Sequence, residues 1–160
     1  MKTLTLIRHA KSSWDDETLD DKARPLNDRG KRDAPKMGER LAKRGVTADL
    51  ILSSPAVRAL TTAEIIAEAI GYKRKHIAVD EHIYEGTPDT LLAMVQAIDD
   101  KHERVMLFGH NPEFSDLARM FSRDIGEMTT CAVAEFTFDV KHWAEIGMAA
   151  PVKVVFETPK

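Results

Sequence analysis

Two apolar segments that each end in a histidine constrain this chain most. Residues 3–7 (Thr-Leu-Thr-Leu-Ile) lead into Arg8 and His9, and residues 105–108 (Val-Met-Leu-Phe) lead into Gly109 and His110. Uninterrupted apolar runs are typical of central parallel strands that are covered on both faces. The carboxyl ends of such strands open into the ligand crevice of an α/β sheet. We therefore expect two imidazoles and a guanidinium to meet at one sheet edge, a combination suited to phosphate and to a nucleophilic nitrogen.

Size and composition set the class of protein. The 160 residues predict one domain, residues 1–160, able to bury a core without disulfides or metal ions. The net charge of −3 provides no general field for nucleic acid or an anionic membrane. No apolar stretch reaches the roughly 18 residues of a membrane span, and the N-terminus has no signal-peptide pattern. The single Cys131 excludes an internal disulfide, so we expect a cytoplasmic location, and we interpret Cys131 as a small core residue. We expect a monomer, since no element shows a spare apolar face.

Strand and helix patterns alternate along most of the chain. Pro35 falls inside one expected helix and either bends it or marks its true start. The expected strands are 2–8, 49–53, 77–79 and 104–108, and the expected helices are 27–44 with Asn27 as N-cap, 56–70, one opening at Thr87-Pro88 and one opening at Asn111-Pro112. The alternation predicts a three-layer α/β/α sandwich with a mostly parallel central sheet, to which segments 132–140 and 152–157 add an antiparallel edge. The aperiodic residues 11–29 are long for a connection and predict a functional loop.

Arg58 stands in the first turn of the expected helix 56–70, just after Ser53-Ser54-Pro55. A cation at a helix N-terminus opposes the helix dipole, so a compensating anion is expected beside it. The same helix end offers free N–H groups to a phosphate. His110 precedes another expected helix and follows a strand, so it converges on the same edge. Both also have plain structural interpretations, as a surface arginine and a capping histidine. The other four histidines show no such placement.

These motifs, in this order, resemble the histidine phosphatase superfamily. The resemblance runs from about residue 2 to 157 and rests on Arg8-His9, on Ser-Ser-Pro followed by Arg58-Ala-x-x-Thr-Ala, and on Gly109-His110-Asn-Pro. Residues 8–14 (Arg-His-Ala-Lys-Ser-Ser-Trp) and 24–30 (Arg-Pro-Leu-Asn-Asp-Arg-Gly) are similar to the compact SixA-type phosphohistidine phosphatases. The chain departs from the common Arg-His-Gly pattern because alanine stands at position 10.

The resemblance implies a phosphoglycerate mutase-like fold and a role for each residue. His9 would be the nucleophile that takes the phosphoryl group, and Arg8, Arg58 and His110 would bind the phosphoryl oxygens. Ser12 matches a position that touches phosphate in larger relatives. No cofactor and no metal is implied. Larger relatives carry a carboxylate general acid between the second arginine and the second histidine, where this chain offers Glu85 first and Glu81 second.

The chemistry explains why these residue types suit phosphoryl transfer. A neutral imidazole attacks at pH 7 without losing a proton, provided that an acceptor, such as a backbone carbonyl, holds its other N–H. Guanidinium forks bind the equatorial oxygens on which the transition-state charge develops. We expect His110 to be a cationic hydrogen-bond donor, because bound phosphate raises its pKa.

The spacing also favours a class of substrate. Only 52 positions separate Arg58 from His110, too few for a helical insert subdomain, so we expect a compact domain with a shallow, open pocket. An open rim favours a phosphorylated protein over a small phosphate ester that needs enclosure. Acidic residues 15–17 and 20–21 would also repel anionic small molecules.

Other functions remain open at this stage. A broad phosphomonoesterase or a mutase-like enzyme would use the same groups, although the end of the chain provides no tail to close over a small substrate. A non-catalytic phosphoprotein-binding module would bind phosphate without turnover. A metalloprotein using His9 and His110 is disfavoured, because two arginines would repel the cation.

Overall fold

The computed structural model describes all residues, 1–160, and its centre is one six-stranded sheet. The strands are β1 (Lys2–Arg8), β2 (Leu50–Ser53), β3 (Ala78–Val79), β4 (Arg104–Gly109), β5 (Val133–Phe138) and β6 (Lys153–Glu157). Their order across the sheet is β3-β2-β4-β1-β5-β6. β1, β2, β3 and β4 are parallel, β5 is antiparallel to β1, and β6 is antiparallel to β5. The predicted parallel sheet with an antiparallel final pair is confirmed.

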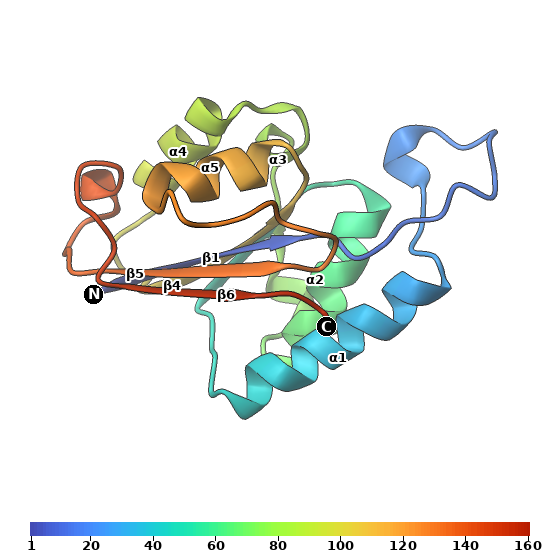
Figure 1. Cartoon of the computed structure of the whole chain (residues 1–160), viewed down its shortest axis with the longest axis horizontal. Helices are drawn as coiled ribbons and strands as arrows, with labels where there is room; N and C mark the ends of the chain where they lie inside the picture. The colour runs from blue at the N-terminus through green and yellow to red at the C-terminus, as the bar shows by residue number, and fades with distance from the viewer.

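Helices cover both faces of this sheet, as Figure 1 shows. The helices are α1 (Asp28–Lys43), α2 (Val57–Ile70), α3 (His82–Glu85), α4 (Pro88–Gln96) and α5 (Glu113–Phe121). α1 and α2 lie on one face, and α3, α4 and α5 lie on the other, which gives the predicted three layers (Figure 1). None of these helices has the length and apolar character needed to cross a membrane.

The core is divided between the two faces because side chains alternate along each strand. Leu4 and Leu6 of β1 belong to the apolar cluster under α4 and α5, whereas Ile7 belongs to the cluster under α1 and α2. β4 alternates in the same way, with Leu107 on the first side and Phe108 on the second. Both strands are therefore buried on both faces, as their uninterrupted apolar runs predict.

The helix ends follow the local sequence signals. The Asn27 side chain accepts a hydrogen bond from the Gly30 N–H at 2.9 Å and starts α1 one residue later. Pro35 lies inside α1, so the alternative that it marks the true start is wrong. Gly71 ends α2 with a φ of +82°, a left-handed conformation that glycine adopts at little cost.

The segment between Arg58 and His110 contains no inserted subdomain. It is taken up by most of α2, then β3, α3, α4 and β4, which all belong to the layers already described. The sequence does not predict the short α3, because four residues are too few to show a helical period. It packs closely on the end of β4: a Cβ on Gly109 would lie only 2.7 Å from Ile83 of α3 and 2.5 Å from Phe114 of α5. Glycine at this position lets both helices approach the strand end.

Candidate active site

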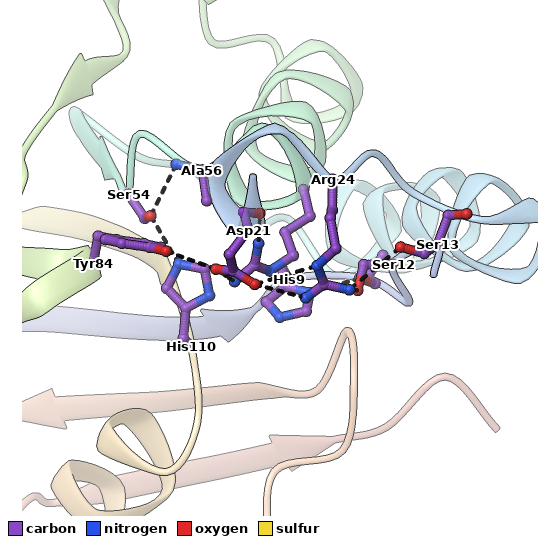
Figure 2. A network of polar contacts seen from close by, with 11 residues as sticks. His9, Ser12, Ser13, Asp21, Arg24, Ser54, Ala56, Tyr84 and His110 are labelled. Atoms are coloured by element: carbon purple, nitrogen blue, oxygen red, sulfur yellow. Dashed lines mark hydrogen bonds and ion pairs between the residues drawn. The ribbon is translucent and has the colours of Figure 1, made fainter. Parts of the chain in front are cut away.

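Three neighbouring parallel strands bring the candidate residues together. In the sheet register, Arg8 at the end of β1 is opposite Gly109 of β4, and Ser53 at the end of β2 is opposite Phe108. The chain continues this pairing beyond the strands, since the N–H of His9 donates to the carbonyl of Gly109 at 3.0 Å. The next residues of the three strands are therefore His9, Ser54 and His110, which lie side by side in Figure 2.

The His9 ring has one tautomer enforced by the backbone. Its Nδ1 lies 2.7 Å from the carbonyl oxygen of Ala10, and a carbonyl accepts only, so Nδ1 carries the proton. Nε2 is then the nitrogen with the free lone pair, and it has no hydrogen-bond partner. Burial lowers the pKa of His9 to about 3. The Ala10 hydrogen bond opposes this shift, and the nearby His110, Arg58 and Arg8 reinforce it. His9 is thus a neutral imidazole at pH 7.

The backbone beneath His9 is held from two sides. The Ala10 N–H donates to Oγ1 of Thr62 in α2 at 3.0 Å, and the Cys131 N–H lies 3.0 Å from the His9 carbonyl oxygen. Ala10 is fully buried and does not need a positive φ, so alanine is compatible with this position. Cys131 is buried beside β5, and burial raises the pKa of its thiol to about 12. This agrees with the interpretation of Cys131 as a core residue.

His110 faces His9 across the site. Their ring centroids are 5.2 Å apart, and Nε2 of His110 lies 2.8 Å from Oγ of Ser54. The Nδ1 atom of His110 is buried without a hydrogen-bond partner. Burial first, then the charge of Arg58, lowers the pKa of His110 to about 4. The expected cationic His110 therefore requires a bound anion, because its own protein surroundings keep it neutral.

The two arginines flank this pair of histidines. Arg8 donates from Nη1 to the carbonyl of Met128 at 3.0 Å, and burial lowers its pKa. Arg8 is half-buried, whereas Arg58, in the first turn of α2 as predicted, is buried. The Nε atoms of both arginines are buried and have no hydrogen-bond partner. With Nδ1 of His110, three of the residues that the sequence predicts for the site each have one buried nitrogen without a hydrogen-bond partner.

The expected anion beside Arg58 is present within the protein itself. Asp21, in the one-turn 3₁₀ helix Asp21–Ala23, accepts from Nη2 of Arg58 at 2.9 Å through Oδ2 and from Nη1 at 2.7 Å through its backbone carbonyl. The Tyr84 hydroxyl donates to Oδ2 at 2.6 Å, and Nε of Arg24 donates to Oδ1 at 3.2 Å. Tyr84 first, and then Arg58, hold the pKa of Asp21 far below its usual range. Figure 2 shows Asp21 between His110 and Arg24.

Ser12 joins the site through Arg24. Its hydroxyl accepts from Nη1 of Arg24 at 3.0 Å, and Ser12 is buried. The Arg24 guanidinium stacks on the exposed Trp14 ring, 3.5 Å from its centroid. Loop residues 11–27 therefore supply two charged side chains, Asp21 and Arg24, to the site.

The two candidate acids lie on the rim. Glu85 is exposed at the end of α3 and makes no hydrogen bond to a site residue, and Glu81 pairs with Lys22 at 2.7 Å. Tyr84, between them in sequence, is the residue of this segment that points to the site, with its ring edge-on to His110 at 5.5 Å. A catalytic role for Glu85 therefore stays a prediction. In the whole structure, no three His, Cys, Asp or Glu side chains are arranged to hold a metal ion.

Sequence reasoning assigns no role to Ser54, Tyr84 or Arg24, and it does not place Asp21 against Arg58. Ser54 and Arg24 lie within the quoted motifs but were given no role. Asp21 is among the acidic residues expected to repel small anions, but nothing in its aperiodic loop indicates its contact with Arg58. Tyr84 lies in a helix too short to show a period.

Comparison with known proteins agrees with this geometry. The family model of the histidine phosphatase superfamily (branch 1) matches residues 4–103. The chain belongs to the histidine phosphatase superfamily. A chloroplastic protein of Arabidopsis thaliana is 31% identical over 152 residues, which are 90% of this chain and 70% of that one.

Two solved structures of SixA proteins share the fold of this superfamily member. One, from Agrobacterium tumefaciens, is 26% identical with a TM-score of 0.79, covering 96% of this chain and 97% of that one. The other, the protein histidine phosphatase SixA complexed with tungstate, is 22% identical with a TM-score of 0.78, covering 98% and 94%. The α/β architecture matches that of SixA over nearly the whole chain.

Proposed function

We propose that this protein is a phosphatase that removes the phosphoryl group from phosphohistidine on a protein, through a covalent intermediate on His9. One observation carries the proposal. The residues around a neutral His9 with a free Nε2 carry three buried, unpartnered nitrogens, Nε of Arg8, Nε of Arg58 and Nδ1 of His110. Buried polar groups normally have partners, so this concentration of unpartnered nitrogens indicates a site for an oxygen-rich ligand.

His9 supplies the nucleophile. Its Nε2 lone pair attacks phosphorus, an Nε2–P bond forms, and the bond between phosphorus and the leaving group breaks. The leaving imidazole takes a proton and departs. Water then attacks the phosphorylated His9, the Nε2–P bond breaks, and inorganic phosphate leaves. The carbonyl of Ala10 orients the ring and stabilises the positive charge that develops on it, in the way that orienting acceptors act on other catalytic histidines.

The cations stabilise the transition state rather than react. Negative charge spreads over the three equatorial oxygens of the transferring group, and fixed donors aimed at them are the largest catalytic contribution. Arg58 supplies such donors from a buried position and Arg8 from a half-buried one. A bound dianion also favours the protonated form of His110, which then donates a further hydrogen bond.

A macromolecular substrate is favoured by the absence of an enclosing subdomain. The chain between Arg58 and His110 is used for the sheet and its helices and forms no separate subdomain over the site; from this segment, Tyr84 of α3 contacts His110. Loop 11–27 places the acidic Asp21 against Arg58, and its negative charge disfavours small polyanions. A phosphohistidine side chain that projects from a protein surface fits these constraints.

The test is phosphate release measured in parallel from a phosphohistidine-carrying protein, a phosphoserine peptide and a small sugar phosphate. We expect kcat/KM to be highest on the phosphohistidine protein by at least about tenfold, which corresponds to about 1.4 kcal/mol of transition-state binding. Comparable values on all three would show a broad phosphomonoesterase instead. Tight binding of the phosphohistidine protein with no release of phosphate would show a binding module.

A further inference from the structure

The strongest feature that the catalytic steps leave unused is the carboxylate of Asp21. It receives hydrogen bonds from three different side chains, Arg58, Arg24 and Tyr84, at 2.6 to 3.2 Å. Arg58 and Arg24 are nearly fully buried, whereas the Asp21 side chain is 48% exposed. The half-exposed carboxylate therefore joins two buried cations.

A carboxylate and a phosphoryl group compete for the same donors. Guanidinium forks bind both kinds of oxyanion with the same bidentate geometry. In this structure, both terminal nitrogens of Arg58 are directed to Asp21, one to its side chain and one to its backbone carbonyl. A phosphoryl group that approaches Arg58 either displaces the Asp21 carboxylate or binds beside its negative charge.

We propose that Asp21 is a specificity-determining residue: its carboxylate partly neutralises Arg58 and Arg24 and weakens the binding of small free dianions. The inference rests on the proposed function, because it concerns the same phosphate-binding groups. A phosphorylated protein offsets this penalty with contacts outside the site, whereas inorganic phosphate or a small ester has none to offer. The penalty therefore separates the two substrate classes.

The position of Asp21 allows it to act in this way without damage to the fold. The 3₁₀ helix Asp21–Ala23 buries none of its residues, and Asp21 reaches the site by side-chain contacts across 37 and 63 positions of the sequence. Its pKa lies far below the usual range, so the carboxylate is charged throughout the working pH range. A charged carboxylate repels an anion but has no proton to donate, which distinguishes this role from that of a general acid.

The test compares Asp21→Asn with the wild-type protein in the binding of tungstate and of inorganic phosphate, measured by titration calorimetry. Asparagine keeps the size and one acceptor oxygen but removes the charge. We expect Asp21→Asn to bind tungstate about tenfold more tightly at low ionic strength, with a smaller gain at about 1 M salt, because the half-exposed carboxylate is screened. We also expect kcat/KM on a small ester to rise.

Asp20→Asn is the matched control, because this substitution changes the net charge by the same amount and the Asp20 side chain makes no capping hydrogen bond to the 3₁₀ helix. Tyr84→Phe removes one hydrogen bond from Asp21 but leaves the charge, so its effect on tungstate binding should be clearly smaller.

If wild-type protein binds no tungstate and releases no phosphate, the proposed function fails. If the wild type binds and turns over but Asp21→Asn binds no more tightly, or gains no more than Asp20→Asn, the role of Asp21 is overturned and the proposed function stands. If Asp21→Asn instead loses turnover of the small ester, and the loss varies with pH as the titration of one group would, Asp21 donates a proton and the proposed role is overturned.

Discussion

Oγ1 of Thr62 lies 3.0 Å from the backbone nitrogen of Ala10 and 2.8 Å from the carbonyl oxygen of Arg58. It accepts a hydrogen bond from the first and donates one to the second. One buried hydroxyl on α2 therefore connects the segment that carries His9 to the helix turn that carries Arg58. Because the Ala10 carbonyl also orients the His9 ring, Thr62 fixes the distance between the nucleophile and a phosphate-binding arginine.

Substituting Thr62 by valine tests this connection. Valine has nearly the same shape, so the variant leaves the buried Ala10 N–H without a partner, which costs about 1–3 kcal/mol of unfolding free energy. We also expect kcat to fall, because the His9 ring loses its fixed position. Denaturant unfolding and phosphatase assays measure the two effects. Thr61→Val is the matched control, since Thr61 is only half-buried. Equal effects of the two substitutions would contradict the assignment.

His9 should carry the phosphoryl group during turnover. Rapid acid quench with a labelled substrate is expected to trap an alkali-stable phosphoenzyme in the wild-type protein and none in His9→Ala, whose turnover should fall at least about a thousandfold. His82→Ala replaces an exposed histidine and serves as the control. Labelling of His9→Ala to the wild-type level would place the nucleophile elsewhere.

Acid should destabilise the fold through the two site histidines. Burial lowers the pKa values of His9 and His110 to about 3 and about 4, below the value of about 6.5 in an unfolded chain. Between these limits the unfolded chain binds more protons, so the unfolding free energy falls as the pH drops below about 6.5. The loss is about 2 kcal/mol per histidine at pH 5.

His110→Gln isolates one of these contributions. The variant has no imidazole to protonate in the unfolded chain, so its unfolding free energy should fall less steeply than that of the wild type between pH 7 and pH 5. Urea titrations at several pH values measure the slope. Parallel slopes for variant and wild type would mean that His110 titrates normally in the folded protein. Added tungstate should raise the pKa of His110 in the wild type, which NMR of the ring protons can follow.

The strand-borne part of the site could be predicted from the sequence because register is a simple rule. Arg8-His9 and Gly109-His110 follow two apolar runs, and parallel strands end at the same edge, so their convergence needs no side-chain detail. Arg58 was found through its unfavourable place at a helix N-terminus. That argument predicted an anion, and the structure supplies one from within the chain, so the position of Arg58 alone is weaker support for phosphate than the three unpartnered nitrogens are.

The loop-borne part could not be predicted, because contacts between aperiodic segments leave no pattern. Asp21 meets Arg58 across 37 positions and Tyr84 across 63, and neither Asp21 nor Tyr84 lies in an element with a period to detect. The same reasoning applies to Glu85: its place in the sequence satisfies the family pattern, whereas the structure shows that Tyr84 is the side chain of α3 that contacts His110.

The proton donor is tested most directly by Glu85→Gln with substrates of different leaving-group strength. If Glu85 donates a proton, the substitution should lower kcat/KM on a phosphoserine peptide by about a hundredfold, the lower end for general acids, since an alkoxide is a poor leaving group. The loss on a phosphohistidine protein should be much smaller, because the P–N bond is labile once the imidazole is protonated. Glu81→Gln is the control, as that carboxylate is held by Lys22. Unchanged rates on both substrates would remove Glu85 from the mechanism and leave protonation of the leaving imidazole to solvent.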